Sequence, residues 1–381
     1  MTEQEAATTA GIGMAGTLRV AVRRAGGRQV GTDDVLVELG QRIPAVRTAL
    51  APALKEANRE LGKPDLGAEP DDGGHTDRLD REVSGVLREA YWAAARVSLR
   101  LHRARVGVDD PVFSPGVRAA LRRAIAGAQR RNVHHAGEPH LVVGLLAGAP
   151  NRATRLLDRH GIDRDGLLRR FDTDEVMDCE HRPLTPAADL LRFTGAIWPE
   201  THRVVRAIGR LSMWAGIRAL NGPVPVVLRT EADRQAIRLG HRRVGTPHLL
   251  LAVMALGAQL QAINCGFRDN DNNAAATVLE SYGLTLGAML DSLNEPGNAA
   301  MELAPSTARR RIGQLWSVET AMEAEDAMRR AVELARAERA ETGTTHLVVA
   351  ALAEPGSSAC DLLDRLGADP ADIVADLERG H

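Results

Sequence analysis

Residues 239–254 read LGHRRVGTPHLLLAVM and contain the signals that decide the fold. The opening leucine and glycine are typical of the end of one helix, and a short connection follows them. We predict that Thr246 caps a second helix, because its hydroxyl can accept a backbone N–H of the first turn. Pro247 then occupies the first helical position, where its missing N–H costs nothing. The run 249–254 is apolar on every face, which predicts a buried helix.

The same pattern occurs three more times along the chain. Residues 136–146 read AGEPHLVVGLL, residues 343–352 read GTTHLVVAAL, and residues 31–39 carry a degenerate copy, GTDDVLVEL. The anchor positions of the four copies are Asp34, His140, His248 and His346. Successive anchors are 106, 108 and 98 residues apart (140−34, 248−140 and 346−248). Internal repetition outranks any single motif as a clue to architecture, and it predicts a chain of repeated helical units.

The sequence around each clear copy extends the pattern. Phe113-Ser114-Pro115 precedes the second copy and ATRLLDRHGID follows it at 153–163, while ATVLESYG (276–283) and ACDLLDRLGAD (359–369) follow the third and fourth. This block resembles one half of a Clp N-terminal repeat domain, the substrate- and adaptor-receiving module of the Clp family of protein-unfolding ATPases. The usual motifs of the family, in chain order, are Phe-Thr-Pro, Gly-Thr-Glu-His-Leu-Leu-Leu-Gly-Leu-Leu and a closing Leu-Leu-x-x-x-Gly.

The resemblance implies an all-α fold of tandem helical half-repeats, three clear and one degenerate, which pair into pseudo-twofold domains. We expect a flexible N-terminus at 1–10 and connecting helices with a linker at 172–220. The first Clp N-like domain is expected at 11–171, with a degenerate repeat at 11–63, an inserted helix at 77–105 and a repeat at 113–171. The second is expected at 221–381, with repeats at 226–293 and 317–379.

Composition narrows the classes of protein to consider. Apolar residues make up 44% of the 381 residues but aromatic residues only 3%, so the cores must consist of leucine, valine and alanine, which favours helices. The net charge of −2 gives no general attraction to nucleic acid or to anionic membranes. Three distant cysteines indicate no disulfide framework. The sequence contains no signal peptide or apolar run of membrane length, and we expect a cytoplasmic protein.

Motifs of catalysis are missing from the sequence. The only Gly-Lys pair, Gly62-Lys63, is followed by Pro64, whereas a phosphate-binding loop needs serine or threonine there. The ATP-hydrolysing motor of the Clp family is therefore absent, and G-x-S-x-G and H-E-x-x-H are absent too. Residues 11–16 match G-x-G-x-x-G, but no strand precedes them, so they are interpreted as a flexible entry to a helix at 17–24. We predict no enzymatic activity and no cofactor.

Histidine and arginine clusters have a functional and a structural interpretation. His134, His135 and His140, and the run 178–181 (DCEH), lack the paired spacing of a structural zinc site, so we predict no metal. Because the anchor histidine recurs at each helix start, a hydrogen bond to the preceding turn is favoured over a ligand role. Residues 309–311 and the other arginine pairs are interpreted as solvated surfaces rather than as a nucleic-acid site.

The resemblance also implies where ligands bind. In the family, a glutamate before the anchor histidine helps to bind phosphorylated arginine, and the matching residues here are Asp33, Pro139, Pro247 and Thr345. Only Asp33 is a carboxylate, which argues against phosphoarginine recognition. Phe113 matches the family aromatic near the surface that receives peptides and cyclic-peptide antibiotics; alternatively, it is wedged between paired half-repeats. The candidate ligand-binding residues are Phe113, Ser114, Val117, Glu138, His140, Thr246 and His248.

These expectations lead to two functional hypotheses. The first is a non-enzymatic Clp N-domain repeat protein that binds peptides, degradation adaptors or peptide-like antibiotics, as an accessory to a Clp unfoldase or a decoy for its ligands. The second is a regulatory or scaffold protein that uses the helices outside the repeats for protein partners. Neither hypothesis involves nucleic acid or membranes.

Overall fold

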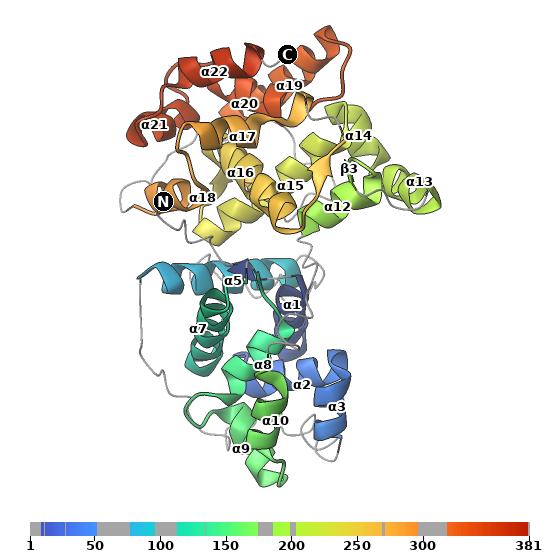
Figure 1. Ribbon diagram of the computed structural model, residues 1–381, viewed down its shortest axis with the longest axis vertical. Helices are drawn as coiled ribbons and strands as arrows, with labels where there is room; N and C mark the ends of the chain where they lie inside the picture. Colours follow the sequence, from blue (N-terminus) through green and yellow to red (C-terminus); the bar gives the residue numbers. More distant parts are fainter. Residues whose placement is uncertain are drawn as a thin grey trace. The chain divides into compact units, whose positions relative to one another are not determined.

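The fold is all-α, as predicted from the sequence (Figure 1). The computed structural model describes residues 9–10, 12–26, 28–51, 77–95, 113–133, 135–173, 186–198, 203–268, 271–295 and 318–379. In these ranges the strands are two residues long and occur in pairs. The chain divides into two compact units, Met1–Pro183 (unit 1) and Leu184–His381 (unit 2), each with its own apolar core. Among the described helices, none is long and apolar enough to cross a membrane.

Unit 1 is built around two pairs of helices. Its elements are β1 (Thr9–Ala10), α1 (Ile12–Ala25), α2 (Thr32–Arg42), α3 (Pro44–Leu50), α5 (Asp77–Ala95), α7 (Pro115–Arg130), β2 (His135–Ala136), α8 (Glu138–Leu146), α9 (Arg152–Arg159) and α10 (Arg164–Phe171). The pairs α1–α2 and α7–α8 pack together, and α5 packs on α1 and α7. The inserted helix therefore covers the first helix of both half-repeats.

Unit 2 repeats this arrangement with further helices before it. Its elements are α12 (Pro186–Thr194), β3 (Ile197–Trp198), α13 (Arg203–Ser212), α14 (Trp214–Leu220), α15 (Pro223–Leu239), β4 (Arg243–Val244), α16 (Thr246–Ala262), β5 (Gly266–Phe267), η2 (Asp271–Asn273), α17 (Ala275–Ser281), α18 (Leu286–Leu293), β6 (Glu319–Thr320), α19 (Met322–Ala337), α20 (Thr344–Leu352), α21 (Ser358–Arg365) and α22 (Pro370–Arg379). The pairs here are α15–α16 and α19–α20.

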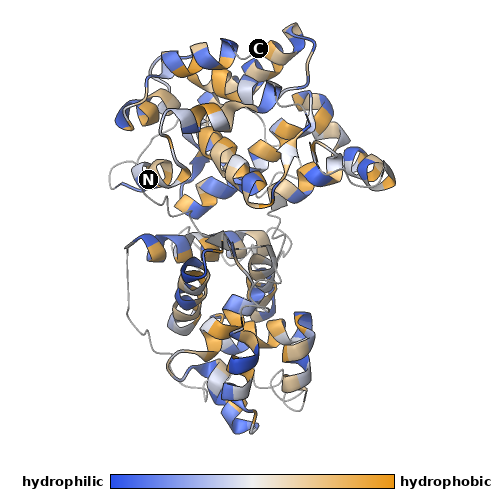
Figure 2. Cartoon of the chain, in the orientation of Figure 1, coloured by the Kyte–Doolittle hydropathy of each residue, from blue (hydrophilic) through white to orange (hydrophobic). Residues whose placement is uncertain are grey.

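In the three clear half-repeats the second helix is far more apolar than the first (Figure 2). In α16 the described side chains from Thr246 to Leu256 are all buried. The first helices are amphipathic instead: α7 buries Val117, Leu121 and Ile125 on one stripe and exposes arginine on the other side. A buried central helix flanked by amphipathic ones is therefore what the sequence pattern predicts.

The predicted helix starts are displaced by one residue. The cap of α16 is Gly245, Thr246 is the first helical residue and Pro247 the second, and the Thr246 hydroxyl caps no amide of its own helix. The prediction that Thr246 is the N-cap is wrong, because the glycine takes up the extended backbone and a side chain three residues later binds its N–H. Gly161 follows the end of α9, and its φ of 64° provides the left-handed turn that terminates the helix.

Short parallel pairings join the half-repeats at matching positions. In unit 1, β1 pairs with β2, and Val30 bridges Phe113. In unit 2, β4 pairs with β6, and the Thr342 N–H donates to the Asn221 carbonyl at 2.8 Å. In all four cases the segment before the second helix of one half-repeat meets the segment before the first helix of the other. Such reciprocal contacts support a pseudo-twofold pairing of the half-repeats.

Several predicted boundaries differ from the observed ones. The strand β1 lies in the stretch expected to be flexible, and α1 begins at Ile12, so Gly13 and Gly16 of the G-x-G-x-x-G match lie in a helix. The segment 186–220, expected to connect the domains, contains α12, α13 and α14 and belongs to unit 2, where Ala188 and Leu191 join the core. Some stretches that the sequence singled out lie outside the described residues. They are 64–76 before the inserted helix, the end of the helix expected at 77–105, His134, the run 178–181 and the arginines at 309–311.

Two buried helical glycines provide a test of the packing. A Cβ at Gly144 of α8 would overlap the carbonyl oxygen of Ala120 in α7, whereas a Cβ at Gly127 of α7 would lie 4.0 Å from its nearest neighbour, the Arg130 guanidinium. We predict that Gly144→Ala lowers the free energy of unfolding by about 1–3 kcal/mol. Gly127→Ala should raise it by up to about 1 kcal/mol, because alanine is the better helix former. Urea denaturation of both variants measures the difference, and equal effects would contradict the close α7–α8 packing.

Candidate functional site

One hydrogen bond recurs at the start of the second helix in all four half-repeats. The N–H of the capping glycine donates to the side chain of the third helical residue, and both atoms are buried. The four bonds are Gly31 N to Asp34 Oδ2 (3.0 Å), Gly137 N to His140 Nδ1 (3.2 Å), Gly245 N to His248 Nδ1 (3.0 Å) and Gly343 N to His346 Nδ1 (3.1 Å). This is the structural role expected of the anchor histidines.

The bond also defines the tautomer of the two anchor histidines in unit 2, His248 and His346. Because Nδ1 accepts, the hydrogen of each neutral ring lies on Nε2. Nε2 of His346 then donates to Glu338 Oε2 at 2.9 Å, and Nε2 of His248 donates to His241 Nδ1 at 2.8 Å. Desolvation, followed by electrostatic repulsion from His241, lowers the pKa of His248 to about 3. His248 is therefore neutral at physiological pH and has a structural role.

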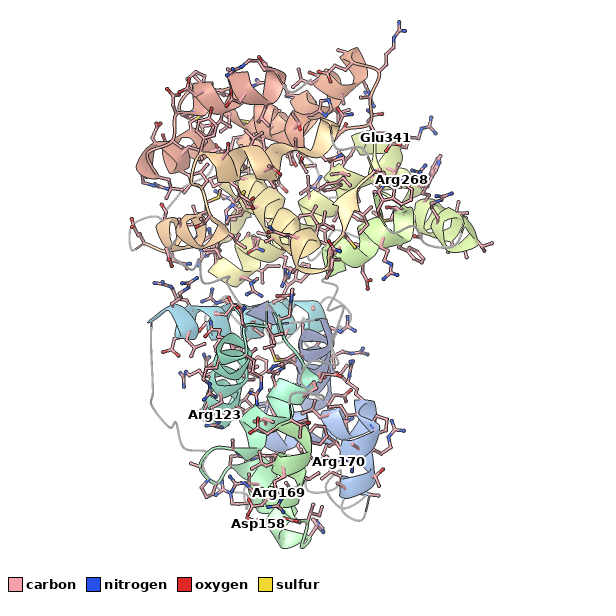
Figure 3. The ribbon with its side chains drawn as sticks, in the orientation of Figure 1. Arg123, Asp158, Arg169, Arg170, Arg268 and Glu341 are labelled. Carbon is pink, nitrogen blue, oxygen red and sulfur yellow. The ribbon has the colours of Figure 1, made fainter. Side chains whose placement is uncertain are left out.

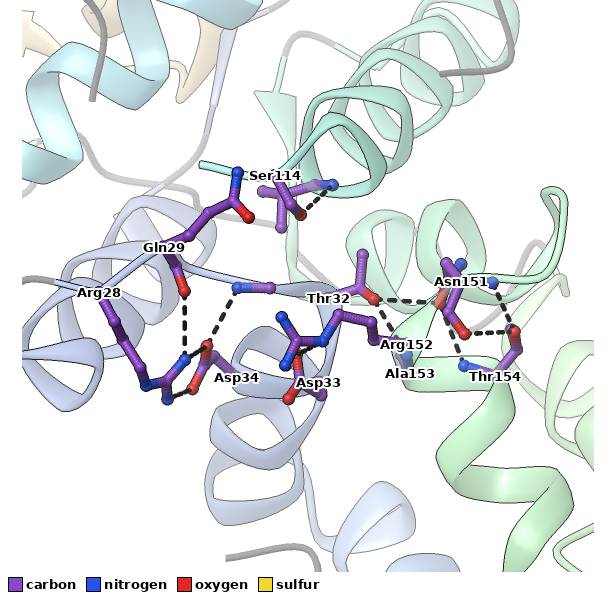
Figure 4. Close-up of polar contacts among 12 residues, drawn as sticks. Arg28, Gln29, Thr32, Asp33, Asp34, Ser114, Asn151, Arg152, Ala153 and Thr154 are labelled. Atoms are coloured by element: carbon purple, nitrogen blue, oxygen red, sulfur yellow. Dashed lines mark hydrogen bonds and ion pairs between the residues drawn. The ribbon is translucent and has the colours of Figure 1, made fainter. Parts of the chain in front are cut away.

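The first helical residue links the two half-repeats of each unit. Thr32 Oγ1 accepts the N–H of Ala153, the second residue of α9, at 2.9 Å (Figure 4). Thr246 Oγ1 does the same for Ala359, the second residue of α21, at 3.0 Å. A threonine of one half-repeat thus satisfies an amide that the helix of the other half-repeat leaves without an intrahelical partner.

The remaining helix starts make contacts in the opposite direction. Thr17 Oγ1 in α1 donates to Glu138 Oε1 at 2.8 Å, and Arg42 Nη1 in α2 donates to the same oxygen at 3.3 Å. In unit 2 the N–H of Thr344 donates to Asn273 Oδ1 at 3.0 Å. These bonds tie the start of α8 to the first half-repeat of unit 1 and the start of α20 to the third half-repeat, in unit 2.

Asp33, the carboxylate at the family's ligand position, is already occupied by an arginine of this chain. Its side chain is buried, and its Oδ1 lies 3.3 Å from Nε of Arg152 in α9 (Figure 4). The adjacent Asp34 forms a two-pronged ion pair with Arg28 and raises the pKa of that guanidinium. Asp33 therefore holds the two half-repeats together, and Asp34 holds the α1–α2 connection. Neither carboxylate is open to a ligand.

The residues proposed as a binding site are mostly inaccessible. Phe113 is 5% exposed and packs in the core of unit 1, and Ser114 caps α7 by accepting the N–H of Val117 at 3.3 Å. The side chains of Val117, His140, Thr246 and His248 are buried as well. A position of Phe113 on a ligand-receiving surface is not supported; the structure favours the alternative that it is wedged between the half-repeats, because its backbone pairs with Val30 and its side chain lies in the core that both share. Of the candidates, only Glu138 is partly accessible.

A different surface carries exposed apolar side chains that the sequence interpretation did not select. Val204, Ile208 and Leu211 of α13, which we call the α13 ridge, are 60%, 54% and 76% exposed. Trp214, which begins α14, and Trp198 of β3 are also exposed. The spacing of four and three residues places the ridge on one side of a helix. The spacing of these three residues can be read from the sequence. Periodicity alone, however, does not tell whether an apolar helix face points to solvent or to the core.

The described part of the chain offers no group of three or more histidine, cysteine or carboxylate side chains that could hold a metal ion. No protein-family model matches the sequence. No curated protein matches it either.

The His248 environment predicts a pH dependence. Because the folded pKa of about 3 lies below the ordinary value of 6.5, the unfolded chain binds the proton more tightly. The contribution of the neutral His248 to the free energy of unfolding should be complete above about pH 6.5. It should fall as the pH is lowered from about 6.5 towards 3. In His248→Asn the amide oxygen can still accept the Gly245 N–H but does not titrate, so we expect a shallower pH dependence of the free energy of unfolding. Identical slopes in the wild-type protein and the variant would contradict a neutral, buried His248.

Proposed function

We propose that the chain is a non-enzymatic helical-repeat protein that binds a partner protein through helices outside the repeats. The observation that carries the proposal is the exposed α13 ridge on unit 2. Polar groups at the helix starts are engaged in holding the half-repeats together. Apart from Met322 in α19, the large exposed apolar side chains of the described residues lie instead on β3, α13 and α14, outside the repeats. Contiguous exposed apolar side chains rimmed by polar ones are typical of a protein-interaction site.

The contact between α13 and α12 supports an outward orientation of the ridge. Among the residues of α13 whose burial is described, Gly209 is the buried one, and a Cβ there would overlap the backbone of Phe193 at the end of α12. At about 100° per residue, Val204 and Leu211 lie roughly 140–160° around the helix axis from Gly209. Helix α13 therefore rests on the rest of unit 2 through a glycine and turns its branched side chains to solvent. Burial of such side chains by a partner stabilises a complex by about 25 cal/mol per Å² of apolar surface.

A second candidate function follows from the resemblance to Clp N-terminal domains. In that function the chain binds peptides, degradation adaptors or peptide-like antibiotics, as an accessory to a Clp unfoldase or as a decoy. The observation that favours it is Glu138, a partly accessible carboxylate at the start of α8 beside Thr17 and Arg42. The family receives ligands at a glutamate directly before the anchor histidine, and Glu138 lies one residue before the matching position, Pro139.

Site-specific cross-linking tests the first proposal. A photo-reactive phenylalanine analogue is introduced at Ile208 on the ridge and, as a matched control, at Met322, which is 49% exposed on α19. We predict that irradiation in the native cells joins a discrete protein to position 208 and not to position 322, because only the ridge would be buried in a complex. Labelling of neither position, or equal labelling of both, would contradict a protein-binding role for α13.

Calorimetry tests the second candidate. A peptide substrate of a Clp unfoldase is titrated into the wild-type protein and into Glu138→Gln, which keeps the Thr17 hydrogen bond and removes the charge. We predict about tenfold weaker binding to the variant, equivalent to 1.4 kcal/mol, if the peptide presents a cation to this carboxylate. The ridge variant Leu211→Ser serves as the control and should bind normally. Equal affinities for wild type and Glu138→Gln would remove Glu138 from the site.

A further inference from the structure

We infer that the segment bound by the α13 ridge is an acidic amphipathic helix of the partner protein. This inference rests on the first function proposed above and adds the chemistry of the partner. The first observation is charge: residues 203–220 contain four arginines and no aspartate or glutamate. An apolar ridge in a stretch of one charge sign selects a partner whose apolar side chains are accompanied by the opposite charge.

Two of these arginines, Arg210 and Arg218, are held in place by contacts other than ion pairs. Arg210 Nε donates to the Thr194 carbonyl at 3.2 Å, and the Arg218 guanidinium lies 5.3 Å from the centre of the Trp214 ring. Among the described residues, no carboxylate forms an ion pair with Arg210 or Arg218. A guanidinium stacked on an indole is pre-oriented and keeps its N–H edge for a carboxylate.

A third arginine extends the basic surface to β3. Arg268 follows β5, and its guanidinium lies 4.9 Å from the centre of the exposed Trp198 ring. Figure 3 shows Arg268 on the side of unit 2 that carries α12, α13 and α14. The pairing of β3 with β5 and the hydrogen bond from the Arg268 N–H to the Ala196 carbonyl hold this residue beside the tryptophan. The surface therefore combines aliphatic, aromatic and cationic groups.

The geometry of the ridge matches a helix better than an extended peptide. Val204, Ile208 and Leu211 follow one another over two helical turns, a length of about 10 Å. Ridges of this spacing pack into the groove between the corresponding side chains of a second helix. Arg210 lies about 100° around the axis from Leu211 and about 160° from Ile208, so it adjoins the ridge at its Leu211 end. It can thus meet a carboxylate that flanks the partner's apolar stripe.

A protein helix is favoured over an anionic lipid surface. An interfacial helix buries a continuous apolar face at the boundary of the acyl chains, with lysine or arginine beside it. The helix α13 has ten residues and only three ridge side chains, and the exposed indole rings are faced by guanidinium groups rather than left bare for acyl chains. Arginine fits carboxylates through two parallel hydrogen bonds, which gives an acidic helix a defined register.

The test uses synthetic peptides about 20 residues long and the full chain. The probe peptide carries leucine at helical spacing with glutamate on both flanks. One control peptide has the same composition with scrambled order, and another has lysine in place of each glutamate. We expect fluorescence anisotropy to detect binding of the acidic amphipathic peptide only. The double variant Ile208→Ser/Leu211→Ser should weaken it at least about tenfold, and Arg210→Gln/Arg218→Gln should weaken it and reduce its salt dependence. Met322→Ser should bind as the wild-type protein does.

Other outcomes would overturn the inference. These are equal binding of the scrambled or lysine peptide, unchanged affinity in both double variants, binding to phosphatidylserine vesicles without peptide binding, and a concentration-dependent dimer that the ridge variants abolish. Failure of the inference is distinguishable from failure of the proposed function. A cross-linked protein at position 208, together with no binding of the acidic peptide, would reject an acidic helix and retain a protein-binding α13.

Discussion

The structure depends on how the chain satisfies the backbone amides at the start of its most deeply buried helices. Each such helix begins after a glycine whose N–H has no backbone partner, in a place that water does not reach. An aspartate or histidine at the third helical position accepts that N–H in all four half-repeats. An unsatisfied buried amide costs about 1–3 kcal/mol. Because the same hydrogen bond is needed at the start of each of these helices, its acceptor recurs at the same position. This explains why the histidine is the most recognisable residue of the repeat.

The same constraint explains why the helix-start residues are poor candidates for a ligand site in this chain. Thr32 and Thr246 satisfy amides in the opposite half-repeat, and Arg152 lies against the Asp33 carboxylate. If a ligand engaged one of these groups, the buried charge or amide that the group now satisfies would lose its partner. An unpaired buried polar group costs free energy. Exposed apolar surface is therefore found on the helices that the repeat does not constrain.

The sequence predicted the all-α class and the structural role of the anchor histidines, because both follow from local patterns of three to twenty residues. It placed the cap of α16 one residue late, since Gly245 and Thr246 are both good caps and only the position of His248 decides between them. Residues 186–220 were assigned to a connection because they lack the repeat pattern, yet Leu191 enters a core made by residues far along the chain. The exposure of Phe113 could not be predicted either, since it depends on the Val30 segment of another half-repeat.

The threonine links between half-repeats also bear on how the protein is made. Ala153 and Thr32 are 121 residues apart in the chain, and Ala359 and Thr246 are 113 apart. During synthesis at 5–20 residues per second, roughly 6–24 seconds pass before the second partner of either bond is added. Through that interval the first half-repeat has an apolar second helix and no opposite half to cover it. Contacts of long range slow folding, so each unit completes its core only when its later half-repeat has emerged, and until then the apolar second helix is exposed to aggregation.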